Sequence, residues 1–242
     1  MTTRATSCEA IEENQENMTY KEHESSAQHK IFEYLTTVTH VLIIGFVLFI
    51  LYLCLTNEWI FFTWHPVLLA TGWVLLMSEG ILLLAPNNTL TRALSLTHKS
   101  RVKYHWIIQI VGIVSSLAGF IVIYINKNLK DKPHFHSWHG LIGLISVIGF
   151  IPSIISGIVA LYGFALKNYI KPVNSKLIHR ICGILTFSIG SITVLLSLYT
   201  KWFQRNVNDL LTITWFIFIS VILIWTISHA SINVFRKLKT IL

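Results

Sequence analysis

Four histidines of this chain stand at matching places in a strongly apolar sequence. His65, His105, His139 and His179 each lie at, or just before, the start of an apolar run. The spacing from His65 to His105 equals that from His139 to His179, so the first pair recurs as a unit later in the chain. Imidazole is the commonest metal ligand among protein side chains. The pattern therefore predicts two copies of one helical hairpin, each of which supplies two candidate metal ligands.

The apolar runs beside these histidines are long enough to cross a membrane. The chain of 242 residues is 53% hydrophobic and only 12% charged, which is too little charge for the surface of a water-soluble domain. A spanning helix needs about 20 apolar residues. Six runs meet that requirement: Thr36–Thr56, Ile60–Ala85, Trp106–Ile125, Leu141–Leu166, Ile181–Thr200 and Leu210–Ser228. We expect an all-α integral membrane protein, a six-transmembrane-helix bundle in which the second to fifth helices form a four-helix core.

The two ends of the chain differ from this apolar middle. Residues 1–33 are rich in glutamate and lack a periodic apolar pattern, so they predict a disordered acidic tail. Residues 34–235 are expected to form one membrane domain, and residues 236–242 a short basic tail. The polar and acidic start predicts that no cleavable signal peptide precedes the first helix.

The basic residues are distributed unequally between the two faces of the predicted bundle. Fourteen of the 19 Lys and Arg residues flank the helices on the side that holds both termini, and five lie on the opposite side. The positive-inside rule therefore predicts that both termini, and this inner face, are cytosolic. The net charge of +8 flanks membrane helices, which favours contact with lipid headgroups over binding of nucleic acid.

Helix direction divides the four histidines into two pairs of equal depth. The second and fourth helices run inward, so His65 and His139 lie near the outer face. The third and fifth run outward, so His105 and His179 lie near the inner face. A haem between two such helices would receive one axial ligand from each. A single buried histidine more often bonds a neighbouring backbone, but four at matched depth indicate a function, because polar groups in hydrocarbon are costly.

The ligand at the start of the fourth helix is ambiguous, because three histidines stand close together. His134, His136 and His139 are all candidates, and His136 is one helical turn before His139. We choose His139 because Gly140 and Gly143 follow it. Their missing side chains would let a flat macrocycle approach the helix.

The other polar residues in or near the spans have more ordinary interpretations. His98 is expected in a loop, and His40 and His229 have no partner in the spacing pattern. Glu79 is expected to pair with a base near the inner face, with a proton-linked role as the alternative. Gln109 is expected to bond a neighbouring helix or the edge of a haem.

Around these histidines the chain resembles the cytochrome b561 family, in particular its shorter transmembrane reductases. The resemblance covers roughly residues 35–235. It rests on the order and spacing of five stretches: Thr63–Val67 (Thr-Trp-His-Pro-Val), Leu75–Glu79 (Leu-Leu-Met-Ser-Glu), Tyr104–Trp106 (Tyr-His-Trp), Ser137–Gly140 (Ser-Trp-His-Gly) and Leu177–His179 (Leu-Ile-His). It implies two haem b groups, one held by His65 and His139 and the other by His105 and His179.

The resemblance also implies transmembrane electron transfer. Family members of this kind take electrons from cytosolic ascorbate and reduce the monodehydroascorbate radical or ferric iron on the other side. They commonly work in the endoplasmic reticulum or other intracellular vesicle membranes, and some are homodimers. Two histidines saturate a haem iron and leave no open position for oxygen, which agrees with a role in passing electrons.

Two basic patches could meet the donor and the acceptor. The inner patch could focus anionic ascorbate or pair with haem propionates, and consists of Arg101, Lys103, Lys176 and Arg180. Positive-inside charge alone explains any single member equally well. The family's basic position before the third-helix histidine is not matched cleanly here, so the donor contacts stay open. The outer patch consists of Lys127, Lys130, Lys132, His134 and His136.

Other classes of function remain possible from the sequence. A transporter without haem could use the histidines for metal or proton relay, but the centres of the third to fifth helices carry no series of ionisable groups. A haem-free scaffold would make the matched spacing a coincidence. The spans hold no second acid beside Glu79 for a di-iron site and no thiolate pair for zinc.

Overall fold

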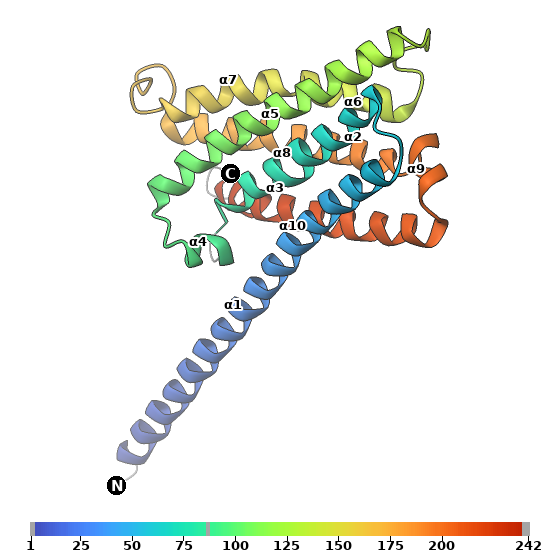
Figure 1. The fold of residues 1–242 in the computed structure, drawn as a ribbon. Coiled ribbons are helices and arrows are strands. Elements are labelled where there is room, and N and C mark those ends of the chain that lie inside the picture. The colour runs from blue at the N-terminus through green and yellow to red at the C-terminus, as the bar shows by residue number, and fades with distance from the viewer. Residues whose placement is uncertain (1–2, 86–87, 239–242) are drawn as a thin grey trace.

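The computed structural model shows a helical molecule over the residues that it describes, 3–85 and 88–238 (Figure 1). Six helical spans among them are long and apolar enough to cross a membrane: Lys30–Thr56, Phe61–Leu82, His98–Asn128, Trp138–Leu161, Pro172–Ser197 and Asp209–Ser228. The predicted all-α six-helix fold is therefore confirmed. Side chains are described for residues 30–85, 88–228, 230–231 and 234.

Two of the six spans are built from several helical elements. The elements in chain order are α1 (Thr3–Thr56), the 3₁₀ turn η1 (Phe61–Thr63), α2 (Trp64–Leu69), the π-helical segment η2 (Ala70–Met77), α3 (Ser78–Leu82), α4 (Thr89–Ala93), α5 (His98–Asn128), α6 (Trp138–Ile148), α7 (Phe150–Leu161), α8 (Pro172–Ser197), α9 (Lys201–Asn206) and α10 (Asp209–Leu238). The second span runs through η1, α2, η2 and α3. The fourth span consists of α6 and α7, which meet at Gly149.

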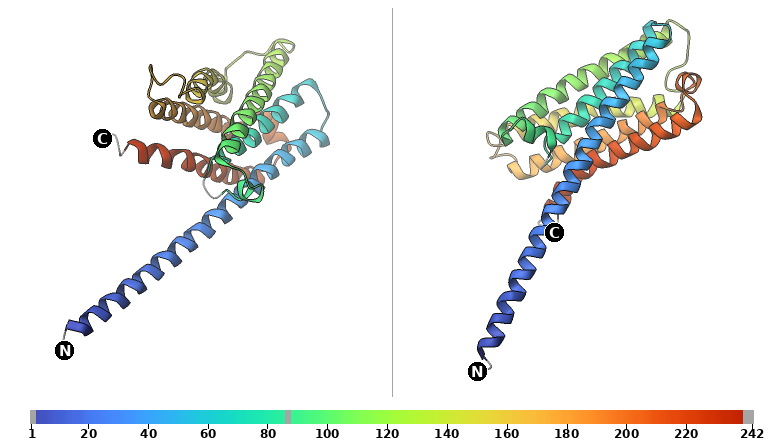
Figure 2. Two further views of the ribbon diagram at one scale, coloured as in Figure 1. Left: turned by 90° about the vertical axis from the view of Figure 1, so that its left-hand side faces the viewer. Right: turned by 60° about the horizontal axis from the view of Figure 1, so that its bottom comes forward.

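Helix α1 is longer than the predicted first span. It begins at Thr3, so the structure has helix where the sequence predicted a disordered tail over residues 1–33. Figure 2 shows the N-terminal part of α1 extending away from the other helices. Because side chains before Lys30 lie outside the described ones, the boundary between tail and membrane domain stays a prediction. Residues 239–242 of the predicted basic tail also lie outside the described residues.

Other boundaries also differ from the prediction, because a search for apolar runs does not detect the residues that begin and end helices. Thr97 caps α5 by accepting a hydrogen bond from the Ser100 backbone N–H at 3.2 Å. His98 is therefore the exposed first residue of α5 and does not lie in a loop. Pro172, whose ring presets the first helical turn, begins α8 before the predicted start. The fourth span ends at Leu161, earlier than predicted.

The helix starts reproduce the spacing of the histidines. We call the interval in residue number from His65 to His139 the repeat spacing, and His105 and His179 are separated by the same interval. Helix α2 begins at Trp64, and α6 begins one repeat spacing later at Trp138. Helix α5 begins at His98, and α8 again begins one repeat spacing later at Pro172. The chain therefore contains a structural repeat of two hairpins, which places equivalent residues at equivalent depths.

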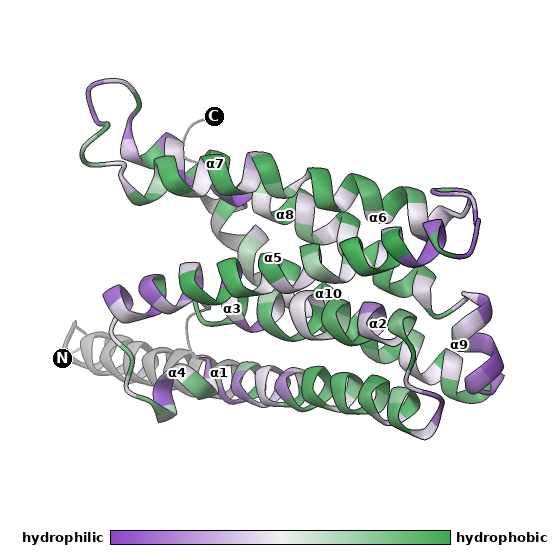
Figure 3. Ribbon diagram, turned by 45° about the horizontal axis from the view of Figure 1, so that its top comes forward, coloured by the Kyte–Doolittle hydropathy of each residue, from purple (hydrophilic) through white to green (hydrophobic). Residues whose placement is uncertain are grey.

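The two hairpins form the centre of the bundle. The second span packs along α5, and α6 and α7 pack along α8. The segment η2 also contacts α8, which joins the hairpins, while α1 packs against α10 and η2. We call the end of the bundle at α4 the inner end and the end at α9 the outer end, after the predicted orientation. Figure 3 shows hydrophobic residues along the middle of the bundle and hydrophilic residues gathered at its ends.

Small residues let the second span and α5 approach closely. A Cβ atom added to Gly72 would lie 2.6 Å from Ser116 Oγ and 2.8 Å from the carbonyl oxygen of Gly112. A larger side chain at position 72 would therefore separate the two helices. Such contacts between small residues are a main source of helix association in a membrane, where apolar burial alone gives no advantage.

An aromatic layer joins the two hairpins midway between their ends. Trp73 of η2 stacks on Phe150 of α7, with ring centres 5.4 Å apart, and on Phe187 of α8, with ring centres 6.4 Å apart. All three side chains are at most 4% exposed. The Trp73 ring also lies directly against the backbone of Gly190 on α8.

We predict that Gly190→Ala destabilises the protein by roughly 1–3 kcal/mol, because the added methyl group overlaps the Trp73 ring. Moving the Trp73 ring would break its stacking on Phe150 and Phe187. Thermal unfolding in detergent, followed by circular dichroism, measures the loss. The control is Gly45→Ala on α1, whose new Cβ would make an ordinary 3.8 Å contact with Trp215. Equal unfolding temperatures for the two variants would contradict the prediction.

Candidate cofactor sites

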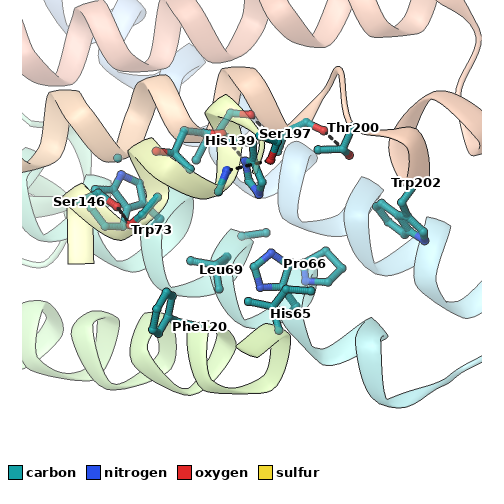
Figure 4. A pocket seen from close by; sticks show the side chains of 18 of the residues that line it. His65, Pro66, Leu69, Trp73, Phe120, His139, Ser146, Ser197, Thr200 and Trp202 are labelled. Carbon is teal, nitrogen blue, oxygen red and sulfur yellow. Dashed lines mark hydrogen bonds between the residues drawn. The ribbon is translucent and has the colours of Figure 1, made fainter. Parts of the chain in front are cut away.

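At the outer end, His65 and His139 face each other across the two hairpins. His65 is the second residue of α2 and His139 the second residue of α6. Their ring centres are 6.2 Å apart, and the ring planes make an angle of 82°. Figure 4 shows both imidazole rings directed into one cavity from opposite walls.

At the inner end, His105 and His179 form a second pair with nearly the same geometry. Each is the eighth residue of its helix, α5 or α8. Their ring centres are 6.3 Å apart, and the ring planes make an angle of 77°. The structure thus brings the four histidines together in the two pairs that the sequence pattern predicts.

A backbone carbonyl of a neighbouring helix fixes the orientation of three of these rings. The Nδ1 atom of His65 is 2.9 Å from the Gly119 oxygen, and that of His139 is 3.0 Å from the Thr193 oxygen. The Nδ1 atom of His105 is 2.7 Å from the Gly80 oxygen. Because a carbonyl oxygen can only accept, Nδ1 carries the hydrogen and Nε2 keeps its lone pair. This is the arrangement in which proteins prepare a histidine to bind a metal ion.

His179 reaches the same state through a serine. Its Nδ1 atom is 3.4 Å from Ser156 Oγ, and the Ser156 hydroxyl donates its own hydrogen to the Pro152 oxygen at 2.7 Å. The Ser156 oxygen is therefore an acceptor for the Nδ1 hydrogen. In all four histidines Nδ1 thus carries the hydrogen and Nε2 keeps its lone pair.

The distance between the paired rings suits one metal ion held between them. A bond from a metal ion to an imidazole nitrogen is about 2 Å long, and the ring centre lies roughly 1 Å beyond that nitrogen. Two histidines on opposite sides of one metal ion therefore have ring centres about 6 Å apart. The observed separations of 6.2 and 6.3 Å agree with this estimate.

The outer pair opens onto a cavity of about 320 Å³. Most of its lining is apolar, and it includes Trp73 and Phe120, which Figure 4 labels. Ligand pockets usually have about 300–1,000 Å³ of space and mostly apolar walls. Gly140 and Gly143 line the same cavity, as expected from their position after His139. The cavity therefore suits a large, flat and mainly apolar group.

The space in front of His179 is also open. Gly183 lies one helical turn after His179 on the same face of α8, and an added Cβ there would meet no atom within 4 Å. No group of three or more His, Cys, Asp or Glu side chains in the described part of the chain could hold a metal ion. Paired histidines suffice for a haem, because the porphyrin supplies the other iron ligands. Both pairs fit axial ligation of a haem.

Comparison with known proteins agrees with this geometry. The sequence model of the family described as eukaryotic cytochrome b561 matches residues 64–204, more than half of the chain. The chain belongs to the cytochrome b561 family. Membership makes it a membrane oxidoreductase that transfers electrons across the membrane, and it implies binding of haem b.

Three relatives within this family carry reductase names. The chain is 30% identical over 182 residues to "Transmembrane reductase CYB561D2" of Bos taurus, covering 74% of this chain and 80% of the relative. It is 29% identical over 171 residues to "Probable transmembrane reductase CYB561D1" of Mus musculus, covering 71% and 73%. It is 28% identical over 147 residues to "Plasma membrane ascorbate-dependent reductase CYBRD1" of Mus musculus, covering 59% and 47%.

The histidines that competed with His139 make other contacts or are exposed. His134 Nε2 is 2.6 Å from Asn128 Oδ1, and the His134 ring stacks on Tyr124 with ring centres 4.3 Å apart. His136 is exposed at the surface. The side chain of His229 lies outside the described ones.

The predicted outer patch only partly reaches the outer cavity. Lys127 and His134 line it, and Lys127 Nζ donates to the Pro133 oxygen at 2.8 Å. The remaining members are exposed: Lys130, Lys132 and His136.

The predicted inner patch lies on α5 and α8 beside the inner pair. Lys103, Lys176 and Arg180 are exposed, whereas Arg101 is half-buried. Arg101 Nε has no hydrogen-bond partner among the described atoms. It lies one helical turn before His105 on α5.

Sequence reasoning missed the acceptors that orient the histidines. Backbone carbonyls carry no side-chain signature, so neither Gly80 nor Gly119 was a candidate. The repeat could have indicated two of these acceptors, however, since Gly119 and Thr193 are one repeat spacing apart, as His65 and His139 are. Sequence reasoning also missed His40, which is bonded to Glu79.

We predict that Gly157→Val lowers the ratio of haem to protein. A Cβ atom at position 157 would lie 3.1 Å from His179 Cε1, so the larger valine would push the ring away from His105. Visible absorbance of the purified protein, scaled to protein concentration, measures the ratio, which should fall by up to half. The control is Ile158→Val at the next residue, whose side chain is 53% exposed on the outside of the bundle. An unchanged ratio in Gly157→Val would contradict the assignment of His179.

Proposed function

We propose that the protein is a di-haem transmembrane reductase. Electrons enter from ascorbate at the inner, cytosolic end and leave to the monodehydroascorbate radical or ferric iron at the outer end. The observation that carries this proposal is the pair of matched sites at opposite ends of one bundle, each with two free Nε2 atoms on rings whose centres are 6.2–6.3 Å apart. Two haem b groups are assigned, one to His65 and His139 and one to His105 and His179.

The haem groups would supply the one-electron chemistry, and the chain supplies positioning and insulation. A haem held by two histidines would have no open iron position for oxygen, so each site would serve electron transfer. Their Nδ1 hydrogen bonds hold the rings in place while the charge of the site changes.

The aromatic layer supports electron transfer over ion transport. Trp73, Phe150 and Phe187 fill the middle of the bundle and are almost fully buried. A transported ion would need polar groups at this depth. An electron needs no such path, so the layer separates the two ends without preventing the proposed reaction.

The inner basic patch supports an anionic donor. Ascorbate is an anion, and Arg101, Lys103, Lys176 and Arg180 lie at the end that holds His105 and His179. One relative, with 28% identity, is named as ascorbate-dependent. The excess of basic residues at this end supports a cytosolic location for both termini.

The outer cavity supports contact with a small acceptor. Its mouth has Lys127 and His134 among its lining residues, together with Tyr124. A location in the endoplasmic reticulum or another vesicle membrane and a homodimeric state stay predictions.

The decisive test is the visible spectrum of the purified protein before and after ascorbate is added. We expect the absorbance of a low-spin b-type haem, and a change in it on reduction. His65→Ala and His105→Ala should each remove about half of the haem, because each variant loses one ligand of one site. His136→Ala is the control and should keep the full haem content, since that ring is exposed. A protein without haem, or a spectrum that ascorbate leaves unchanged, would overturn the proposal.

The donor contact has its own test. Arg101→Gln should raise the apparent KM for ascorbate several-fold, because the half-buried guanidinium has an unpartnered Nε atom that an anion can take. Steady-state reduction by ascorbate measures the KM, and the haem content shows whether the cofactor is affected instead. Lys103→Gln, which removes an exposed charge nearby, should have a smaller effect. Equal KM values for Arg101→Gln and the unaltered protein would rule out Arg101 as the contact.

A further inference from the structure

A polar cluster outside the two histidine pairs lies at the inner end of the bundle. His40 of α1 bonds Glu79 of α3, with Nδ1 and Oε1 2.8 Å apart. Asn88, directly before α4, bonds the other side of the ring, with Nδ2 and Nε2 3.3 Å apart. The side chains of His40 and Glu79 are each 15% exposed, so the cluster is nearly enclosed.

The hydrogen bonds of Asn88 determine where the protons of this cluster are. The Thr91 backbone N–H donates to Asn88 Oδ1 at 3.1 Å, so that atom is the amide oxygen. Asn88 Nδ2 then donates to the Leu82 oxygen at 3.0 Å and to His40 Nε2. His40 Nε2 must therefore accept, and His40 Nδ1 must carry the hydrogen that it donates to Glu79.

The cluster thus combines an imidazole that donates from Nδ1 with a carboxyl group that accepts at Oε1. Only Glu79 Oε1 receives a hydrogen bond. Glu79 Oε2 is buried and has no partner among the described atoms. A buried carboxylate that is neutralised by no cation is costly, and protonation removes that cost.

Glu79 is directly connected to the inner histidine pair. The next residue, Gly80, accepts the Nδ1 hydrogen of His105 at 2.7 Å. Reduction of the inner site adds negative charge at this end of the bundle, which favours uptake of a proton by the carboxylate.

Few other charges face this cluster from the packed elements described in the structure. From α1 and α4, Glu33 and Arg92 form their own ion pair at 2.6 Å nearer the surface. On α5, Arg101 and His105 lie at this end, and Gln109 is neutral and donates to the Met77 oxygen at 3.1 Å. On α10, the apolar Ile222 packs with Leu82 of α3 in one buried cluster.

We infer that Glu79, oriented by His40 and Asn88, is a proton acceptor coupled to the redox state of the inner site. This inference rests on the proposed function. When ascorbate monoanion is oxidised to its radical, it releases one electron and one proton. The electron passes to the His105–His179 site and the proton to Glu79 Oε2. When the electron leaves for the outer site, Glu79 returns the proton to the inner side.

The test is the number of protons taken up when the purified holoprotein is reduced. A pH-indicator dye in weakly buffered detergent solution measures the protons, and the visible spectrum measures the electrons. We expect up to one proton per electron at the inner site. Glu79→Gln keeps an oxygen that accepts from His40 Nδ1 but removes the charge, so uptake should fall close to zero. In the unaltered protein the equilibrium constant for reduction should fall tenfold for each unit of pH increase, which is about 59 mV in the potential for one electron. Glu79→Gln should remove this pH dependence.

The matched control is Glu33→Gln, which removes a carboxylate that is already paired with Arg92 at the same end. It should leave proton uptake unchanged. Uptake that persists in Glu79→Gln with full haem content would overturn the inference and leave the proposed function intact. Absence of haem from the unaltered protein would instead overturn the proposed function.

A measurement on the unaltered protein covers the case in which Glu79→Gln fails to fold. The infrared difference spectrum between the reduced and oxidised states should contain the C=O band of a newly protonated carboxyl, which shifts in heavy water. In Glu79→Asp this band should move in frequency. A difference spectrum without any protonated carboxyl band would overturn the inference.

Discussion

The hydrogen bond from Nδ1 of each paired histidine to a neighbouring helix is the interaction on which the rest of the structure depends. An imidazole in a membrane interior must find a partner, because no water is there to replace it. In three of the four cases that partner is a main-chain carbonyl, so the bond ties two helices together and fixes the ring at once. The same bond assigns the hydrogen to Nδ1 and leaves Nε2 free. In this bundle the hydrogen bond that joins two helices therefore also prepares the histidine to bind a metal ion.

The repeat explains why the two outer histidines are equivalent and why the inner two are not. Gly119 and Thr193 stand one repeat spacing apart and accept the same bond in the two hairpins. The second and fourth spans are irregular at matched places in the repeat. The second has π-helical geometry at η2, and the fourth breaks at Gly149, whose oxygen accepts from Thr186 Oγ1 at 2.9 Å. Beyond these points the repeat is inexact, and the inner acceptors become Gly80 and Ser156. The second hairpin thus has no equivalent of Glu79, which makes the inner end chemically distinct.

Periodicity and charge in the sequence were sufficient to predict the six spans, the four histidines and their pairing by depth. Those features depend on residue type and spacing, which the sequence contains directly. The starts of α5 and α8 were missed because capping by Thr97 and Pro172 is a local backbone effect. His40 was set aside because no histidine stands one repeat spacing away from it, yet it bonds the acid for which an inner-face base was expected. A partner outside the repeat can be found only from the packing of α1 against the second span.

The positions of the aromatic layer and the Glu79 cluster together restrict what can cross the bundle. Trp73, Phe150 and Phe187 place buried aromatic rings between the two histidine pairs, and no ionisable side chain belongs to this layer. The Glu79 carboxyl group lies at the inner end of the bundle, on one side of this layer. In the proposed cycle a proton bound there returns to the side from which it came, while the electron continues outward. Each turnover then moves one net charge across the membrane, so a transmembrane potential acts directly on the reaction, with about 2.3 kcal/mol per 100 mV for the full distance.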